Sequence, residues 1–211
     1  MRALRKVPQY AILILLSIVF LMPFLWMLST SLKGGTDDIF SYPPEFIPNS
    51  FHWDNYSKVL SMYPWGQFLK NTCLITFISM GATLLSSSMV AFAFARLRFP
   101  GREKLFWLVL ATMMVPYYTT LIPQYILFTK LGWVNTLKPL IVPNFFGSAF
   151  YIFMLRQFFM GIPPELDDSA RIDGASTWRV FWTIYLPLAK PAIITVCILQ
   201  FMSAWSDFIG P

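Results

Sequence analysis

Long runs without a charged residue alternate along this chain with shorter segments in which the charges gather. The charge-free runs cover residues 7–32, 71–95, 105–129, 139–155 and 191–206. A helix needs about 20 apolar residues to cross the hydrocarbon core of a membrane, and the first three runs exceed that length. The last two are shorter, but polar residues beside them can reach the headgroups. The pattern predicts an all-α, polytopic transmembrane helical bundle.

The runs define five membrane helices and one polar loop within a single transmembrane domain over residues 1–211. We expect the helices near residues 8–31, 70–96, 105–128, 138–158 and 191–210, and the loop over 161–190. The first run follows a basic leader, as a signal peptide would. It is far longer than the roughly 7–15 apolar residues of a signal sequence and has no small-residue cleavage site, so we expect an uncleaved helix.

Composition supports a membrane protein and excludes several other classes. Hydrophobic residues make up 56% of the chain and charged residues 12%, against about 25% charged in soluble domains. Cys73 and Cys197 lie inside apolar runs and His52 in a polar loop, so we expect packing and surface roles and no metal site or disulfide. There is no catalytic constellation and no phosphate-binding loop, so we expect no enzymatic activity and no cofactor.

The basic residues follow membrane topology, and the net charge of +6 therefore does not indicate nucleic-acid binding. Cytoplasmic loops carry an excess of lysine and arginine. Placing the N-terminus inside puts most of the 16 basic residues in the cytoplasm. These are Arg2, Arg5, Lys6, Arg96, Arg98, Arg102, Lys104, Arg156, Arg171, Arg179 and Lys190. Five lysines (Lys33, Lys58, Lys70, Lys130, Lys138) and four acids (Asp37, Asp38, Glu45, Asp54) are expected outside.

Local signals refine the helices and the outer loop. In the loop from residue 33 to 70, a short helix near 54–60 could be capped by Asp54 or Asn55. Prolines in the membrane helices predict kinks: Pro23, Pro116, Pro123 and Pro143. Small residues in the second helix suit close helix packing: Gly81, Ala82, Ser86, Ser87 and Ser88.

The segment over residues 161–190 is too polar to span the membrane and too patterned for a passive linker. After Pro163 and Pro164, acidic residues stand where the helix dipole favours negative charge. Gly174 fits the left-handed residue that ends a helix, and Ser176 or Thr177 can cap a second helix ending at Pro187. This helix–corner–helix is equally compatible with a protruding knob for a partner protein and with a helical hairpin on the membrane surface.

The spacing within this segment resembles the EAA loop of ABC-importer permeases, whose pattern is Glu-Ala-Ala, three residues, Gly, nine residues and Ile-x-Leu-Pro. Here Asp168-Ser169-Ala170 precedes Asp173-Gly174, and Ile184 and Leu186-Pro187 follow at the matching distances. Asp168 and Ser169 depart from the pattern, although Asp168 keeps the negative charge on a shorter stem. The stretch over residues 135–191 resembles the second permease subunit of maltose-type importers. The carbohydrate branch of the family is also similar at Ser31-Leu32-Lys33, Tyr42-Pro43-Pro44, Asn55-Tyr56 and Asn71-Thr72.

The resemblance implies a type I importer fold and a set of partners in a bacterial or archaeal inner membrane. These are a second permease subunit, a cytoplasmic ATPase dimer that hydrolyses the ATP, and an extracytoplasmic solute-binding protein. It also implies that the loop is the ATPase-coupling element, with Glu165, Asp168, Ser169, Ala170, Asp173 and Gly174 as its key residues. We expect Asp167, by contrast, to be a solvated first-turn residue. The family normally has a sixth helix, so we expect this chain to be either a fragment or the product of a shortened gene.

Residues that could contact a sugar are aromatic, amide or hydroxyl side chains in the third and fourth helices: Tyr117, Tyr118, Gln124, Asn144 and Tyr151. Asp207 is expected near the outer membrane interface. The function indicated is a sugar or oligosaccharide permease. A permease for another solute, such as an amino acid or a phosphonate, and a membrane-anchoring or assembly protein remain the alternatives.

Overall fold

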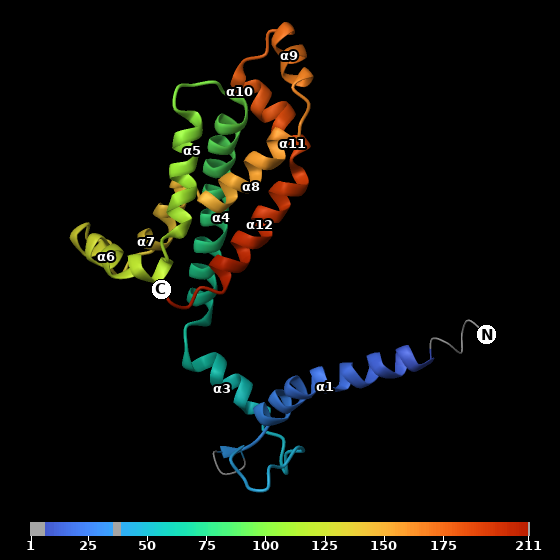
Figure 1. Ribbon diagram of the computed structural model, residues 1–211. Helices are drawn as coiled ribbons and strands as arrows, with labels where there is room; N and C mark the ends of the chain where they lie inside the picture. The colour runs from blue at the N-terminus through green and yellow to red at the C-terminus, as the bar shows by residue number, and fades with distance from the viewer. Residues whose placement is uncertain (1–6, 36–38, 211) are drawn as a thin grey trace. The chain divides into compact units, whose positions relative to one another are not determined.

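The computed structural model describes residues 7–35 and 39–210, and this part of the chain contains helices and no strands (Figure 1). The basic leader Arg2, Arg5 and Lys6 and the acids Asp37 and Asp38 lie outside the described residues. The chain divides into two compact units, Met1–Gly66 and Gln67–Pro211.

The first unit contains α1, the outer loop and α3. Helix α1 (Val7–Ser31) contains Pro23, and α3 spans Asp54–Met62. The expected cap of α3 is wrong, because neither Asp54 nor Asn55 caps it. The Asn55 amide instead donates to the carbonyls of Ser31 and Lys33, 3.1 and 2.9 Å away, and so satisfies the end of α1. A hydrogen bond from Lys58 lowers the pKa of Asp54.

Lys33 lies inside this unit, although the sequence predicted only that it is on the outer side of the membrane. Its side chain is buried, its Nζ donates to the Glu45 carbonyl at 2.6 Å and it lies 4.6 Å from the Trp26 ring centroid. Both contacts compensate for the loss of water around the ammonium group.

The second unit is a bundle around the long helix α4 (Trp65–Arg96), which begins five residues before the expected start. The other helices of the bundle are α5 (Arg102–Ala111), α6 (Tyr117–Lys130), α7 (Lys138–Ile141), α8 (Ala149–Met160), α9 (Glu165–Ile172), α10 (Thr177–Val180), α11 (Leu186–Leu188) and α12 (Lys190–Trp205). Short 3₁₀ segments cover Thr112–Met114 and Val142–Phe146, and a π-helical turn covers Phe181–Tyr185.

Within the described residues, three helical stretches are long and apolar enough to cross a membrane, or up to five if each of two bent pairs is one span. The three are Gln9–Ser31, Trp65–Arg96 and Lys138–Met160. The bent pairs turn by 95° between Met114 and Tyr117 and by 78° between Leu188 and Lys190. The region expected as one third helix is therefore broken at Pro116, where a kink was predicted. Helix α12 ends at Trp205, five residues before the expected end.

The core of the second unit lies where α4, α8, the π-helical turn and α12 meet. Ala91, Leu155, Phe159, Tyr185 and Val196 are fully buried there. Of the small residues in α4, Ala82, Ser87 and Ser88 are buried and allow neighbouring backbones to approach. Gly81 is exposed, and no atom of the described chain lies within 4 Å of the position its Cβ would take, so it packs against no other helix of this chain.

Candidate functional site

The segment from Glu165 to Lys190 folds as a helix, a glycine corner and a second helix at one end of the second unit (Figure 1). Gly174 has a φ of +74°, a conformation that other residues rarely adopt. The Ala175 N–H donates to Ala170 and the Gly174 N–H to Arg171, at 2.9 and 3.0 Å. These two bonds are those of a Schellman motif, which satisfies the last carbonyls of α9. The predicted corner is confirmed.

The second helix of this segment begins as expected and ends differently. The Ser176 hydroxyl accepts a hydrogen bond from the Arg179 N–H at 3.3 Å and caps α10. Pro187 does not end the helix, because it occupies the first turn of α11 (Leu186–Leu188), where proline needs no N–H partner. The break comes instead at Ala189, and Pro191 stands in the first turn of α12, as expected.

Most of the predicted coupling residues lie on the surface of α9 and its corner. Exposed residues are Glu165, Asp168, Ser169, Asp173 and Gly174, and Ala170 is half-buried against the core. The three acids of the first turn, Glu165, Asp167 and Asp168, stand at the positive end of the helix dipole. The surface offered by this corner is therefore acidic and exposed.

Asp167 is not a solvated first-turn residue, and the expectation for it is wrong. Its Oδ1 accepts a hydrogen bond of 2.6 Å from the hydroxyl of buried Tyr185. The guanidinium of Arg96 lies 5.0 Å from the Tyr185 ring centroid and donates to the carbonyls of Phe159 (3.0 Å) and Ile162. Arg96, Tyr185 and Asp167 thus join the end of α4, the end of α8, the π-helical turn and α9.

A cavity of about 730 Å³ lies between α9 and the turn that follows α4. Its charged lining residues are Arg96, Arg98, Arg102, Asp167, Asp168 and Arg171. Since both signs are present and Asp168 is exposed, this hollow suits a protein partner with charged side chains of its own.

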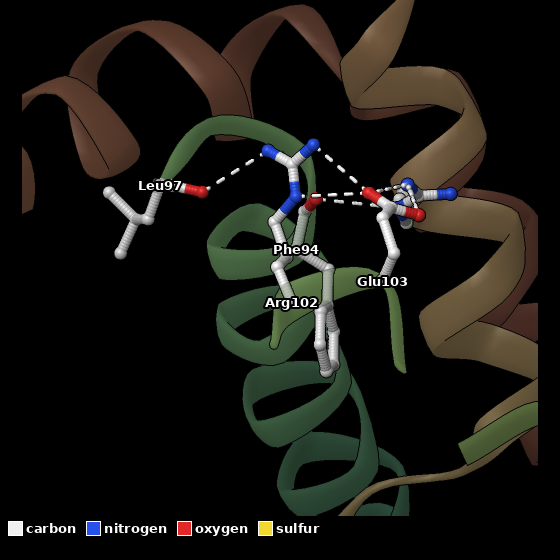
Figure 2. Close-up of polar contacts among 5 residues, drawn as sticks. Phe94, Leu97, Arg102 and Glu103 are labelled. Atoms are coloured by element: carbon white, nitrogen blue, oxygen red, sulfur yellow. Dashed lines mark hydrogen bonds and ion pairs between the residues drawn. The ribbon is translucent and has the colours of Figure 1, made fainter. Parts of the chain in front are cut away.

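A second charged network holds the ends of α4, α5 and α8 together. Arg156 is buried in α8, and its Nη2 lies 3.3 Å from both carboxylate oxygens of Glu103. Its Nε donates to the Phe94 carbonyl at 3.3 Å. Figure 2 shows Arg102 contacting the same Glu103 while donating to the Leu97 carbonyl, at 3.0 and 3.2 Å. The sequence predicted only that Arg156 lies on the cytoplasmic side of the membrane, and not that it holds these helices together.

A second cavity, of about 460 Å³, lies among α4, α6, the α7 region and the end of α12; we call it the transport cavity. Three of the five predicted pathway residues line it: Tyr117, Gln124 and Asn144. Tyr118 is exposed beside Tyr117 and Tyr151 is buried in the core, and neither lines this cavity. The remaining lining residues are Thr72, Ile75, Ser79, Pro139, Leu140, Pro143, Gln200, Ser203, Ala204, Trp205 and Asp207.

Asn144 lies at the centre of a hydrogen-bond network at the wall of the transport cavity. Its Oδ1 accepts from Thr83 at 3.1 Å and from Gln200 at 3.2 Å, and its Nδ2 donates to the Leu140 carbonyl at 2.8 Å. The amide of Asn144 is therefore largely used within the protein. Sequence reasoning missed Gln200, although a lone amide in the apolar run of the last helix is a usable signal.

Asp207 lies just beyond α12 and not within a helix. Its Oδ1 accepts from the N–H groups of Ile209 and Gly210, at 3.1 and 3.0 Å. These bonds hold the carboxylate in the turn after Trp205, where Asp207 lines the transport cavity.

The chain is similar in sequence to known membrane transport proteins. Residues 83–211 match the family described as binding-protein-dependent transport system inner membrane component. The diacetylchitobiose uptake system permease protein NgcG of Streptomyces coelicolor is 31% identical over 204 residues, which are 96% of this chain and 67% of that protein. The lactose transport system permease protein LacG of Rhizobium radiobacter is 30% identical over 210 residues, covering 100% and 76%.

A solved structure has the same fold. It is a bacterial ABC transporter involved in the import of the acidic polysaccharide alginate, with a TM-score of 0.80 and 24% identity. The match covers 97% of this chain and 72% of the other.

Proposed function

Because this chain belongs to the family of binding-protein-dependent transport system inner membrane components and is a multi-pass permease subunit, we propose that it carries a sugar or oligosaccharide into the cell. Two relatives are named for the transport of diacetylchitobiose and lactose. The transport cavity supports a sugar through its aromatic, amide and hydroxyl lining, such as Tyr117, Trp205, Gln124 and Ser203. Tyr118 and Tyr151 do not line this cavity, so we do not expect them to contact the sugar.

The second part of the proposal concerns the partners. A second permease, a pair of ATPase subunits and an extracytoplasmic binding protein complete the importer, and the ATPase supplies the hydrolysis. The acidic corner formed by α9 and Gly174 carries this part of the proposal, because it is exposed while the residues behind it are anchored in the core. The docking surface for the ATPase is formed by Glu165, Asp168, Ser169, Ala170, Asp173 and Gly174. The motion of the ATPase is transmitted to the helical bundle as a rigid-body movement.

The orientation follows from the same assignment. The corner and the basic ends of α4 and α5 lie in the cytoplasm, which places the N-terminus inside if the bent pair Arg102–Met114 and Tyr117–Lys130 is one span. Residues 1–211 then act as one permease domain with five spans.

Substitution of Gly174 by aspartate tests the coupling role. The Cβ of a side chain at this position meets nothing within 4 Å, and aspartate tolerates a positive φ better than most residues. The fold should therefore persist while a bulky, charged group blocks docking. In proteoliposomes that contain the complete importer, we expect ATP-driven sugar uptake to be lost while the membrane content of the variant stays unchanged.

A matched control is Gly132→Asp, at another open glycine with a φ of +66° and outside the coupling segment. This variant should retain uptake. Normal uptake by the Gly174 variant would show that the corner does not couple to the ATPase. If the unmodified importer showed no ATP-driven uptake of any sugar, the sugar-permease proposal itself would be wrong.

A further inference from the structure

The charge of the transport cavity is low and of one sign. Among the lining residues in the described part of the chain, Asp207 is the only acidic or basic side chain. No lysine, arginine or histidine is among them. The other polar groups are neutral amides and hydroxyls, which include Gln124, Gln200 and Ser203.

This lining distinguishes between anionic and uncharged solutes. A carboxylate or phosphate that leaves water needs a cation or several donors to replace its hydration. Here it would instead approach the Asp207 carboxylate, and repulsion between like charges grows as water is excluded. The hydroxyl groups of a sugar, by contrast, can donate hydrogen bonds to a carboxylate, and such charge-assisted bonds are strong.

The carboxylate of Asp207 is held in a position from which it can act on a solute. Both backbone donors, Ile209 and Gly210, bind Oδ1. Within the part of the chain that the structure describes, Oδ2 accepts no hydrogen bond. The rings of Tyr117 and Trp205 line the same cavity, and aromatic faces pack well against the C–H face of a pyranose ring.

We propose that the transport cavity selects an uncharged oligosaccharide, with Asp207 as the specificity-determining residue that accepts sugar hydroxyls and repels acidic sugars. This inference rests on the proposed function as a sugar permease. The proposed substrate is uncharged, like the sugars carried by lactose transporters. It differs in charge from the substrate of the alginate importer that has the same fold, because alginate is acidic.

The test compares uncharged and acidic sugars on the purified complex of the two permeases and the ATPase, without the binding protein, so that the binding protein's own selectivity is excluded. The probes are lactose, N,N′-diacetylchitobiose and dimannuronate, an acidic disaccharide. Thermal unfolding of the complex is followed at increasing sugar concentration. We expect at least one uncharged disaccharide to raise the melting temperature, and dimannuronate to have no effect.

Three variants sharpen the test. Asp207→Asn should weaken binding of the uncharged sugar about tenfold, because an ionic acceptor contributes more than a neutral one. Asp207→Lys should give a complex that dimannuronate stabilises. Asp54→Asn removes an exposed acid outside the cavity and should change neither response.

Two results would overturn the proposal: stabilisation of the unmodified complex by dimannuronate to the same extent as by the uncharged sugars, or no response of Asp207→Lys to dimannuronate. Either result leaves the sugar-permease proposal intact, because that proposal depends on ATP-driven uptake by the complete importer. An importer that took up no sugar would refute the permease proposal instead.

Discussion

Asp167 and Asp168 are adjacent in the first turn of α9, yet their surroundings differ. Asp168 is exposed, whereas Asp167 accepts a hydrogen bond from buried Tyr185. Tyr185 in turn packs beneath the guanidinium of Arg96 at the end of α4. The first turn of α9 is therefore connected to α4, the longest helix of the bundle, through the contacts of Asp167 with Tyr185 and of Tyr185 with Arg96. We therefore propose that Tyr185 holds α9 in position for the proposed coupling to the ATPase.

Replacing Tyr185 by phenylalanine tests this role with minimal loss of packing. Loss of the hydrogen bond to Asp167 costs about 1–3 kcal/mol, so α9 should leave its position more often. In proteoliposomes we expect ATP-driven uptake to fall about fivefold, while ATP hydrolysis without the binding protein is unchanged. The two activities are measured on the same preparation.

The controls separate positioning from general stability. Asp167→Asn keeps an oxygen acceptor for the Tyr185 hydroxyl and should retain most of the uptake. Tyr125→Phe removes the hydroxyl of an exposed tyrosine in α6 and should have no effect. If Tyr185→Phe lowered uptake and hydrolysis equally, the connection would serve stability alone.

The coupling residues show what sequence can predict at this scale. Gly174 and Ser176 were predictable because their roles are local: a left-handed corner and a cap need only the neighbouring residues. The contact of Asp167 with Tyr185 joins positions 18 residues apart, and that of Arg156 with Glu103 joins positions 53 apart. Such pairs depend on how the helices pack, which the spacing of charges along the chain does not specify.

Among the elements, the α7 region illustrates how an irregular segment is stabilised inside a membrane bundle. Between α7 and α8 the helix is interrupted by a 3₁₀ segment, Val142–Phe146, which contains Pro143. Backbone carbonyls freed by such a break need partners within the protein. Ser79 donates to the Leu140 carbonyl at 3.1 Å, and Thr83 and Ser86 donate to that of Asn144 at 3.4 Å. Serines and threonines of α4 therefore hold the broken segment.

Asn144→Leu should destabilise this arrangement. The Asn144 side chain joins Thr83 in α4 to Gln200 in α12. Leucine would leave Gln200 without this partner and Thr83 with only the longer contact to the Asn144 carbonyl. A buried polar group that loses its partner costs about 1–3 kcal/mol. We expect the melting temperature of the purified complex to fall by several degrees, about 2–4 °C per kcal/mol for a chain of this size.

The double variant Asn144→Leu with Gln200→Leu distinguishes this network from simple steric damage. Removing both polar partners should recover part of the lost stability, because Gln200 is no longer left unsatisfied. Additive losses from the two substitutions would show that the hydrogen bond between them contributes nothing.

The elements themselves were largely predictable, since uninterrupted apolar runs of about 20 residues leave few alternatives to a membrane helix. The bends were predictable in position but not in size. Pro116 indicated a kink, and the structure has a 95° turn there. A proline removes one donor and restricts one dihedral angle, while the angle that results is set by the neighbouring helices. The transport cavity forms at this bend, so its lining was only partly predictable.

For the whole molecule, the distribution of basic residues defines two ends of the second unit. Arg96, Arg102, Arg171 and Arg179 lie at the end that carries α9 and α10. Lys130 and Lys138 lie in α6 and α7, toward the opposite end (Figure 1). Since cytoplasmic loops are enriched in basic residues, the arginine-rich end is expected to face the cytoplasm, on the side of the proposed ATPase partner.

Single cysteines test this orientation directly. Cys73 and Cys197 are free and half-buried, so alanine at both positions gives a background without thiols at small cost in packing. Arg179 and Lys130 are exposed at opposite ends of the unit and each is replaced by cysteine in that background. In intact cells a membrane-impermeant maleimide should label the cysteine at 130 and not the one at 179. After permeabilisation both should react. Labelling of position 179 alone in intact cells would reverse the orientation. It would place the α9 corner outside, where no ATPase could reach it.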